Sequence, residues 1–324
     1  MTSLGMTIPV EGDALSHQFA VAQELELLGY ASVWSSEGMG ADAFIPLAVA
    51  ASATQVLRLG TAIASVYLRG PGCLAQTAAT LAAIAPGRLT IGVGSSSNLI
   101  VSQWNDREFD RPYQRTLDTV RFLKKVFAGE RVDEDFETFT IRGFRLSETP
   151  STPPKILVAA LRSRMLKMAG TEADGAIINW LSADDVKIVA PHVRQDGNEK
   201  EIVARIMVAP TTDTEVARSI GRRLVSTYLT VPVYKAFHEW LGRADALDQT
   251  WRLWESGDRK GATAAVPDSV VDDLIVYGTP DECRARIQHY VDSGVTTPVL
   301  SMLPIGEQNP FEYIRALAPI NTST

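Results

Sequence analysis

Apolar runs of five to nine residues alternate with helix-patterned segments along most of this chain. Between the runs, apolar positions recur every three to four residues, which is typical of helices that bury one face. Strands that alternate with helices in this way form a parallel sheet, because each helix returns the chain to the same end of the sheet. The predicted strands span residues 3–8, 31–35, 57–65, 88–94, 155–160, 174–179, 202–209 and 298–303.

Eight strand-and-helix units within 324 residues predict one α/β domain over residues 1–324, folded as a (β/α)8 TIM barrel. Two stretches are longer than the barrel needs. Residues 130–148, after the fourth strand and its helix, and residues 232–270, after the seventh strand, are therefore predicted to be insertions. Large apolar residues in the second insertion fall at roughly helical spacing: Phe237, Trp240, Leu241, Leu247, Trp251 and Trp254. They favour an extra helical layer or a dimer interface over a substrate lid.

Small or polar residues follow several predicted strands, at the edge where a TIM barrel carries its active site. The polar candidates are Ser36, Glu37, Ser65, Ser95, Ser96, Ser97 and Asn179. Glu37 is the only carboxylate in this set. Two interpretations of it remain open: contact with a cofactor or substrate, or a structural role as a helix cap or a salt bridge at the rim.

The fifth predicted strand leads into a helix with a basic first turn, which contains Arg162, Ser163 and Arg164. Free backbone N–H groups of a first helical turn, with two guanidinium groups beside them, can bind a phosphate or a carboxylate. Arginines that are merely solvated on the helix surface are the alternative.

Composition narrows the classes of partner. With 45% apolar and 21% charged residues the chain resembles a soluble globular protein, and a net charge of −7 disfavours nucleic acid and anionic membranes as main partners. Cys73 and Cys283 lie far apart with no further ligand nearby, so neither a disulfide framework nor a metal site is predicted. A cytoplasmic location is expected, because the first residues also lack the pattern of a signal peptide. The four histidines show no metal-ligand spacing: His17, His192, His238 and His289.

The motifs of two large enzyme classes are missing from the sequence. It contains no Gly-x-Ser-x-Gly nucleophile elbow and no P-loop lysine motif, so neither nucleophilic hydrolysis nor nucleoside triphosphate chemistry is indicated. The chemistry is therefore expected to belong to a bound cofactor.

Five short segments, in this order along the chain, resemble the bacterial luciferase-like flavin and deazaflavin oxidoreductases. They are Leu28–Trp34, Asp42–Ala48, Leu59–Ile63, Pro86–Arg88 and Ile91–Gly94. The likeness extends over nearly the whole chain and is strongest to the branch that uses coenzyme F420, an 8-hydroxy-5-deazaflavin with a phosphate and glutamate tail. FMN is the alternative cofactor.

The resemblance implies roles for individual residues. Glu37 would contact the deazaflavin, a non-prolyl cis peptide between Ala62 and Ile63 would lie behind its ring, and the loop after the fifth strand would hold its phosphate. Ser65 and Asn179 match further cofactor or substrate positions. The implied cofactor site comprises Glu37, Ala62, Ile63, Ser65, Leu161, Arg162, Ser163, Arg164, Met165 and Asn179.

The chain departs from the sugar-phosphate and alcohol dehydrogenases of this branch at three positions. Gly38 replaces a histidine, Ser97 replaces a glutamate, and Ser182 replaces a lysine that would meet a sugar phosphate. Glu37 and Ser97 remain as candidate catalytic groups, although His238 from the second insertion could reach into the site.

The resemblance therefore predicts a homodimeric enzyme that transfers hydride between C5 of coenzyme F420 and a small organic substrate. Because the usual proton-transfer residues are replaced, reduction of an activated double bond is favoured over oxidation of an alcohol. An FMN-dependent monooxygenase and a non-catalytic flavin-binding or deazaflavin-binding barrel are the alternatives.

Overall fold

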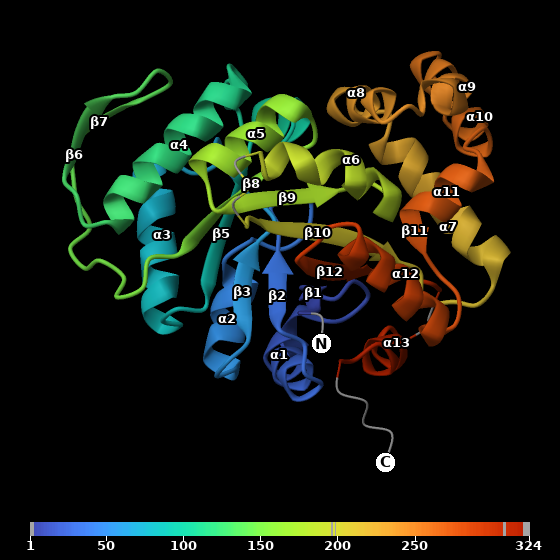
Figure 1. Ribbon diagram of the computed structural model, residues 1–324, viewed down its shortest axis with the longest axis horizontal. Helices are drawn as coiled ribbons and strands as arrows, with labels where there is room; N and C mark the ends of the chain where they lie inside the picture. The colour runs from blue at the N-terminus through green and yellow to red at the C-terminus, as the bar shows by residue number, and fades with distance from the viewer. Residues whose placement is uncertain (1–2, 196, 198, 307–308, 320–324) are drawn as a thin grey trace.

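The strands of the computed structural model close into a parallel barrel (Figure 1). The structure describes residues 3–195, 197, 199–306 and 309–319. All barrel pairings are parallel, and β1 pairs with both β2 and β12, so the ring has no free edge. The barrel strands are β1 (Gly5–Thr7), β2 (Ser32–Ser35), β3 (Arg58–Thr61), β5 (Leu89–Gly94), β8 (Lys155–Ala159), β9 (Gly175–Asn179), β10 (Glu201–Val208) and β12 (Thr297–Met302). The prediction of a (β/α)8 barrel is confirmed.

Helices connect the strands and cover the outside of the barrel. They are α1 (Gln18–Leu27), α2 (Ile45–Ala53), α3 (Pro71–Ile84), α4 (Pro112–Phe127), α5 (Ser163–Glu172), α6 (Ala183–Val193), α7 (Thr214–Tyr228) and α12 (Pro280–Asp292), with α13 (Phe311–Ala316) near the end of the described chain. Two of them begin with a capping box, Ser182 with Asp185 in α6 and Thr279 with Glu282 in α12. Each box satisfies backbone N–H groups that the first helical turn leaves free.

The third predicted strand, residues 57–65, is interrupted in the structure. β3 ends at Thr61, β4 (Ala64–Ser65) continues beside β5, and the peptide bond between Ala62 and Ile63 is cis, as the resemblance implies. The Ala62 N–H donates to the carbonyl of Ser35 at 2.6 Å, and the Glu37 N–H donates to the carbonyl of Ile63 at 3.1 Å. The interruption is thus tied to the end of β2.

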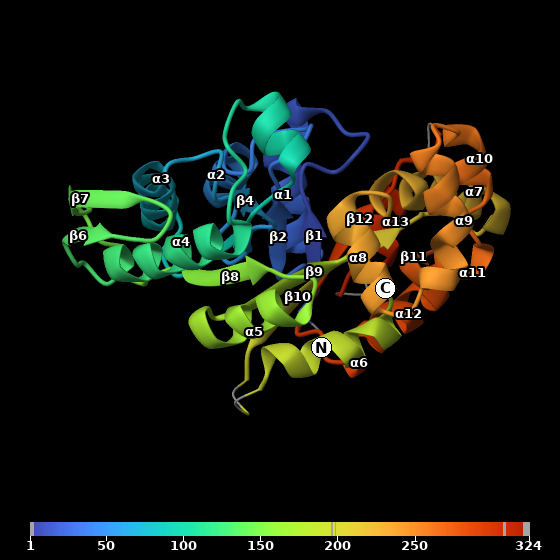
Figure 2. The same ribbon diagram turned by 90° about the horizontal axis from the view of Figure 1, so that it is seen from above.

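The first insertion forms an antiparallel hairpin, β6 (Val132–Asp135) and β7 (Thr140–Phe144), whose strands the sequence pattern did not predict. Its aromatic side chains pack around Phe122 of α4, with ring centroids 5.5–6.3 Å apart. The hairpin is too short and too exposed to show a regular alternation of apolar and polar residues. It lies at the opposite end of the molecule from the second insertion in both views (Figures 1 and 2).

The second insertion is helical, as its aromatic spacing predicts. It comprises α8 (Pro232–Trp240), α9 (Ala244–Glu255), α10 (Arg259–Ala264) and α11 (Asp268–Leu274), followed by the short strand β11 (Ile275–Val276), which pairs with the end of β10. Phe237, Leu247 and Trp251 are buried. These residues therefore pack an extra helical layer, one of the two structural interpretations that the sequence favoured.

Side chains fill the barrel in layers, because alternate residues of each strand point inward. At the base, Glu201 pairs with Arg58 at 2.6 Å and with Lys155 at 3.2 Å. Above this layer the interior is apolar and contains Trp34, Leu157, Ile177, Val203 and Val299. Gly60 is required here, since a Cβ atom on it would lie 2.2 Å from the ring of Trp34. The filled lower interior leaves the carboxyl ends of the strands as the place for a ligand.

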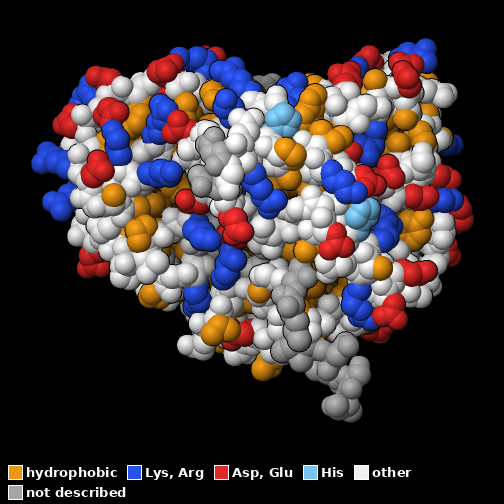
Figure 3. Space-filling model, viewed as in Figure 1, with side chains coloured by type: hydrophobic (Ala, Val, Ile, Leu, Met, Phe, Trp, Pro, Cys, Tyr) orange, Lys and Arg blue, Asp and Glu red, His pale blue; other side chains and the backbone are white. Residues whose placement is uncertain are grey.

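Acidic and basic side chains are interspersed on the face shown in Figure 3. Among the described residues, no helix is both long and apolar enough to cross a membrane. Cys73 is exposed and Cys283 is buried, and neither is bonded to another cysteine.

Candidate functional site

Small residues form one wall of the barrel mouth. Ile63, which follows Ala62 in the strand interruption, lies beside Gly94 of β5, and Ala159 of β8 lies on the other side of Gly94. A Cβ atom on Gly94 would lie 2.9 Å from Cβ of Ala159 and 3.1 Å from Cγ1 of Ile63, so only glycine lets these strands approach so closely. The result is a compact wall of half-buried apolar groups at the strand ends.

Glu37 follows β2 and is held by its own chain. Its Oε2 accepts the backbone N–H of Ser65 at 2.7 Å, and its Oε1 pairs with Nε of Arg69 at 2.9 Å. Arg69 also pairs with Asp42, which caps the start of α2 through the N–H groups of Phe44 and Ile45. The salt-bridge interpretation of Glu37 is therefore observed, while a contact with cofactor or substrate stays a prediction.

A groove of about 360 Å³ runs along this part of the rim. Its walls are Glu37, Gly38, Gly40, Ala41, Asp42, Leu68, Arg69, Ile100 and Asn105. Gly38, which stands where related dehydrogenases carry a histidine, has no atom within 4 Å of the position that a Cβ would take. The missing imidazole thus leaves open space at the rim.

The other rim candidates differ in their surroundings. Ser65 is fully buried, and its Oγ accepts the Tyr67 N–H at 3.3 Å. Ser97 accepts the Ile100 N–H at 3.4 Å, at the start of a π-helical segment, Leu99–Trp104. Ser95 and Ser96 lie in the preceding turn, where Ser96 has a φ of 61°. Among the residues that the structure describes, neither Ser65 nor Ser97 has a basic partner that would activate its hydroxyl.

Asn179, at the end of β9, contacts the second insertion. Its amide Nδ2 donates to the hydroxyl oxygen of Tyr234 at 3.1 Å. Tyr234 belongs to α8, and burial raises the pKa of its hydroxyl, so it is neutral at physiological pH. The insertion therefore brings a neutral phenol to the barrel mouth, a contribution that sequence analysis missed.

The start of α5 contains the residues of the predicted anion site, and anion binding there stays a prediction. Arg162 occupies the N-cap position without a capping hydrogen bond from its side chain, and Ser163 and Arg164 follow on the surface. The Arg164 guanidinium lies 4.0 Å from the ring centroid of Tyr113. Within the described parts of the chain, neither arginine makes an ion pair. Leu161 and Met165 are half-buried against the core.

His238 does not reach the mouth, contrary to the expectation that it could. Its side chain is fully buried in α8, next to the ring of Phe237. Burial, assisted by the charge of Arg243, lowers the pKa of His238 to about 4. It is thus a neutral packing residue at pH 7, because α8 turns this face toward the core.

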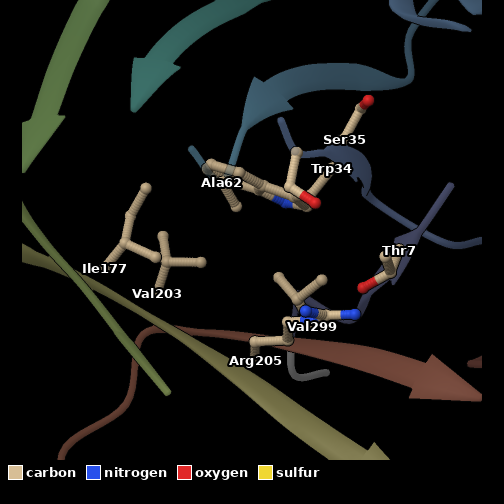
Figure 4. Close-up of a pocket in the computed structure, with 9 residues that line it drawn as sticks. Thr7, Trp34, Ser35, Ala62, Ile177, Val203, Arg205 and Val299 are labelled. Carbon is tan, nitrogen blue, oxygen red and sulfur yellow. The ribbon is translucent and has the colours of Figure 1, made fainter. Parts of the chain in front are cut away.

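A small pocket just inside the mouth contains two further residues that sequence analysis missed, Thr7 and Arg205 (Figure 4). Ser36, Ala62, Ile177 and Val299 also line it. The available signal was a charge within an apolar strand, since Arg205 alternates with Val203 and Met207 along β10. The sequence alone does not show whether an arginine within an apolar strand has a partner.

Residues 2–297 match the family model described as luciferase-like monooxygenase. The chain belongs to the luciferase-like monooxygenase family. This membership confirms the recognised resemblance and, at the level of the family, the prediction of an oxidoreductase.

Several known proteins are similar to this chain over most of their length. An F420-dependent glucose-6-phosphate dehydrogenase of Beutenbergia cavernae is 32% identical, with 81% of this chain and 78% of the relative covered. A 5,10-methylenetetrahydromethanopterin reductase of Methanolobus tindarius is 24% identical, with 88% and 89% covered. The structure of the coenzyme F420-dependent tetrahydromethanopterin reductase of Methanopyrus kandleri has a TM-score of 0.80 at 19% identity and covers 98% of this chain and 97% of that one.

Proposed function

We propose that this luciferase-like protein is a coenzyme F420-dependent oxidoreductase that reduces an activated double bond of a small organic substrate. The names of its relatives support the cofactor, since two of those described above are F420-dependent by name. When bound, a deazaflavin supplies or accepts a hydride at C5. The proposed direction and substrate type rest on the side chains of this chain.

The observation that carries the proposal is a compact apolar wall followed directly by a cationic helix start. Ala62, Ile63 and Ala159 form the wall, and Arg162 comes three residues after Ala159. Such a wall fits a flat ring, and the first turn of α5 with its two unpaired guanidinium groups fits an anionic tail. The residues present therefore fit a deazaflavin with a phosphate-bearing tail. Arg162 and Arg164 would hold the tail, and Ala62 and Ile63 would support the ring.

The polar groups of the rim favour a substrate that accepts hydride without strong acid catalysis. Glu37 is engaged with Ser65 and Arg69, and no described basic residue bonds to Ser97. General acid–base catalysis contributes about 10²–10⁴-fold to a rate, so an enzyme that lacks it needs a readily reduced acceptor. An activated alkene or imine meets this condition, whereas a simple alcohol requires a base.

Titration of the protein with coenzyme F420 and with FMN, followed by fluorescence, tests the cofactor assignment. We expect F420 to bind more tightly. The double variant Arg162→Ala and Arg164→Ala should bind F420 at least tenfold more weakly, because each charge-assisted hydrogen bond contributes about 1.5–3 kcal/mol. The matched control is Arg142→Ala with Arg145→Ala, which removes two exposed arginines from the β6–β7 hairpin and should leave affinity unchanged.

The other outcomes identify the alternatives. Preference for FMN, with oxygen consumption by the reduced flavin complex, would favour an FMN-dependent monooxygenase, since deazaflavin lacks the N5 that supports oxygen activation. Tight binding of F420 without discharge of the reduced cofactor to any electrophile would favour a non-catalytic binding barrel. Efficient oxidation of glucose 6-phosphate or a secondary alcohol would contradict the proposed reaction. A homodimeric state and a cytoplasmic location stay predictions from the resemblance.

A further inference from the structure

The upper layer of the barrel interior contains a cation without a counter-charge. Glu201, Val203 and Arg205 alternate along β10 and point into the barrel. At the base, Glu201 is paired with Arg58 and Lys155. Arg205 lies one layer above Val203, and no described carboxylate lies within ion-pair distance of it. The charges of Arg58 and Lys155 at the base are thus balanced by Glu201, whereas no described carboxylate balances the charge of Arg205.

One hydrogen-bond donor of Arg205 has no partner among the described residues. Its Nη2 donates to Oγ of Ser301 at 2.8 Å, whereas its Nε is buried and has no hydrogen-bond partner among the described residues. Burial lowers the pKa of Arg205, and the groups that act on it next are Tyr228, Tyr234 and the exposed Glu11. A guanidinium remains charged in a protein even so, and a buried charge without a partner destabilises the fold.

A second unsatisfied polar atom faces the same space. Oγ1 of Thr7 is buried without a hydrogen-bond partner in the described structure. Figure 4 shows the Arg205 guanidinium next to Thr7, with Ala62 and Trp34 on the opposite side of the pocket. Ile177 is one of the apolar side chains that line the pocket. The two unsatisfied donors, in a pocket that Ser35 and Ser36 also line, form a site for an acceptor oxygen, and the charge favours an anionic one.

The size and position of the pocket indicate which molecule supplies that oxygen. Its volume is about 10 Å³, enough for a single water-sized group. A terminal oxygen can therefore reach Arg205 while the rest of its molecule stays in the mouth, beside Ala62. The anionic tail of the proposed cofactor has its own cationic site at Arg162 and Arg164, so the oxygen at Arg205 belongs to the substrate.

We propose that Arg205 and Thr7 bind a carboxylate of the substrate, and that the protein acts on small carboxylic acids. Because Ala62 lines the same pocket, the reacting carbon lies within a few bonds of that carboxylate. This assignment rests on the proposed function for the reaction itself, whereas the anion site stands on the geometry of Arg205.

Acetate, the smallest stable carboxylate with a carbon chain, is the probe, and acetamide is its neutral counterpart. At constant ionic strength, 13C NMR titration should detect acetate binding to the wild-type protein at least tenfold tighter than acetamide binding. Arg205→Met should abolish the preference for acetate, and Thr7→Val should weaken acetate binding at least threefold. The Arg162→Ala and Arg164→Ala double variant lacks the other cationic site, which could also take up acetate, and it should retain the acetate binding that Arg205→Met removes.

The melting temperature of the ligand-free protein is a second readout. If Arg205 had a structural role, replacing it would lower the melting temperature. Removal of an uncompensated buried charge should raise the melting temperature of Arg205→Met above that of the wild type, as at other sites where function costs stability. Equal binding of acetate and acetamide by the wild type, or an Arg205→Met protein that is less stable or fails to fold, would overturn the assignment. F420 titration separates the two proposals: failure of the wild type to bind F420 contradicts the proposed function, and the acetate results decide the anion site independently.

Discussion

Both carboxylate oxygens of Glu37 are engaged within the protein, one by the Ser65 N–H and the other by Arg69. These bonds join the end of β2 to β4, on the far side of the interruption at Ala62 and Ile63. A proton on either oxygen would displace a donor. Glu37 is therefore suited to positioning the rim and not to delivering protons.

The variant Glu37→Gln should lose less than about tenfold in turnover and retain cofactor affinity, because an amide oxygen can still accept the Ser65 N–H. Steady-state kinetics with the reduced cofactor measures this. Asp42→Asn is the matched control, since it removes the other carboxylate bound to Arg69 and keeps a residue that can cap α2. Similar small losses in both variants would assign both to positioning. A loss of more than about 10²-fold in Glu37→Gln alone would make Glu37 the catalytic acid.

His238 predicts a specific dependence of stability on pH. Its pKa is lowered to about 4 by burial and by Arg243, partly offset by Asp185, against 6.5 in an unfolded chain. Below pH 6.5 the unfolded state therefore binds a proton that the folded state excludes. The contribution of the neutral His238 side chain to stability is therefore complete above pH 6.5 and is lost as the pH falls toward 4.

When the pH falls from 7.5 to 4.5, the free energy of unfolding should fall by about 2–3 kcal/mol less in His238→Leu than in the wild type. This amount follows from the difference between the folded and unfolded pKa values of His238. Urea unfolding at the two pH values measures this difference. His17→Gln, which alters an exposed histidine bonded to Asp13, should follow the wild type within about 0.5 kcal/mol. Parallel pH profiles for His238→Leu and the wild type would show that folding does not lower the pKa of His238.

Among the elements, α8 of the second insertion makes a polar contact with the barrel mouth. The Tyr234 hydroxyl meets the Asn179 side chain there, while the neighbouring Tyr228 stacks on Trp180 with ring centroids 4.7 Å apart. One tyrosine thus makes a hydrogen bond and the other a ring contact. The two kinds of contact can be separated by removing each hydroxyl.

Tyr234→Phe should reduce the free energy of unfolding by about 1 kcal/mol, because it leaves the half-buried Asn179 amide without this partner. Tyr228→Phe keeps its ring contact and should leave stability unchanged. Urea denaturation of both variants provides the measurement. Equal effects of the two substitutions would mean that the hydrogen bond contributes nothing to the attachment of the insertion.

Across the whole molecule, the sequence predicted the features that repeat and missed those that depend on a single contact. The eight strands, their order and both insertions follow from periodic burial, which every residue of a strand or helix helps to specify. The cis bond between Ala62 and Ile63 was predicted only through the resemblance, because no local pattern distinguishes this interruption from a continuous strand.

The missed site residues were hidden for physical reasons. Arg205 lies in a strand whose neighbours are apolar, and its missing partner becomes visible only when the strands opposite are in place. Tyr234 reaches Asn179 from 55 residues away along the chain, a separation that no sequence period encodes. Glu37 was found because it directly follows a strand, but its two competing roles could be told apart only by its contacts.

The groups assigned to the cofactor and those assigned to the substrate come from different strands of the barrel. The apolar wall and the cationic helix start are built from residues 62–164, whereas Thr7 lies on β1 and Arg205 on β10. The closed barrel brings these strands together without requiring one set of residues to change with the other. Within such an architecture, a lineage can keep its coenzyme while residues on β1 and β10 diversify, so new substrates can evolve without a new redox centre.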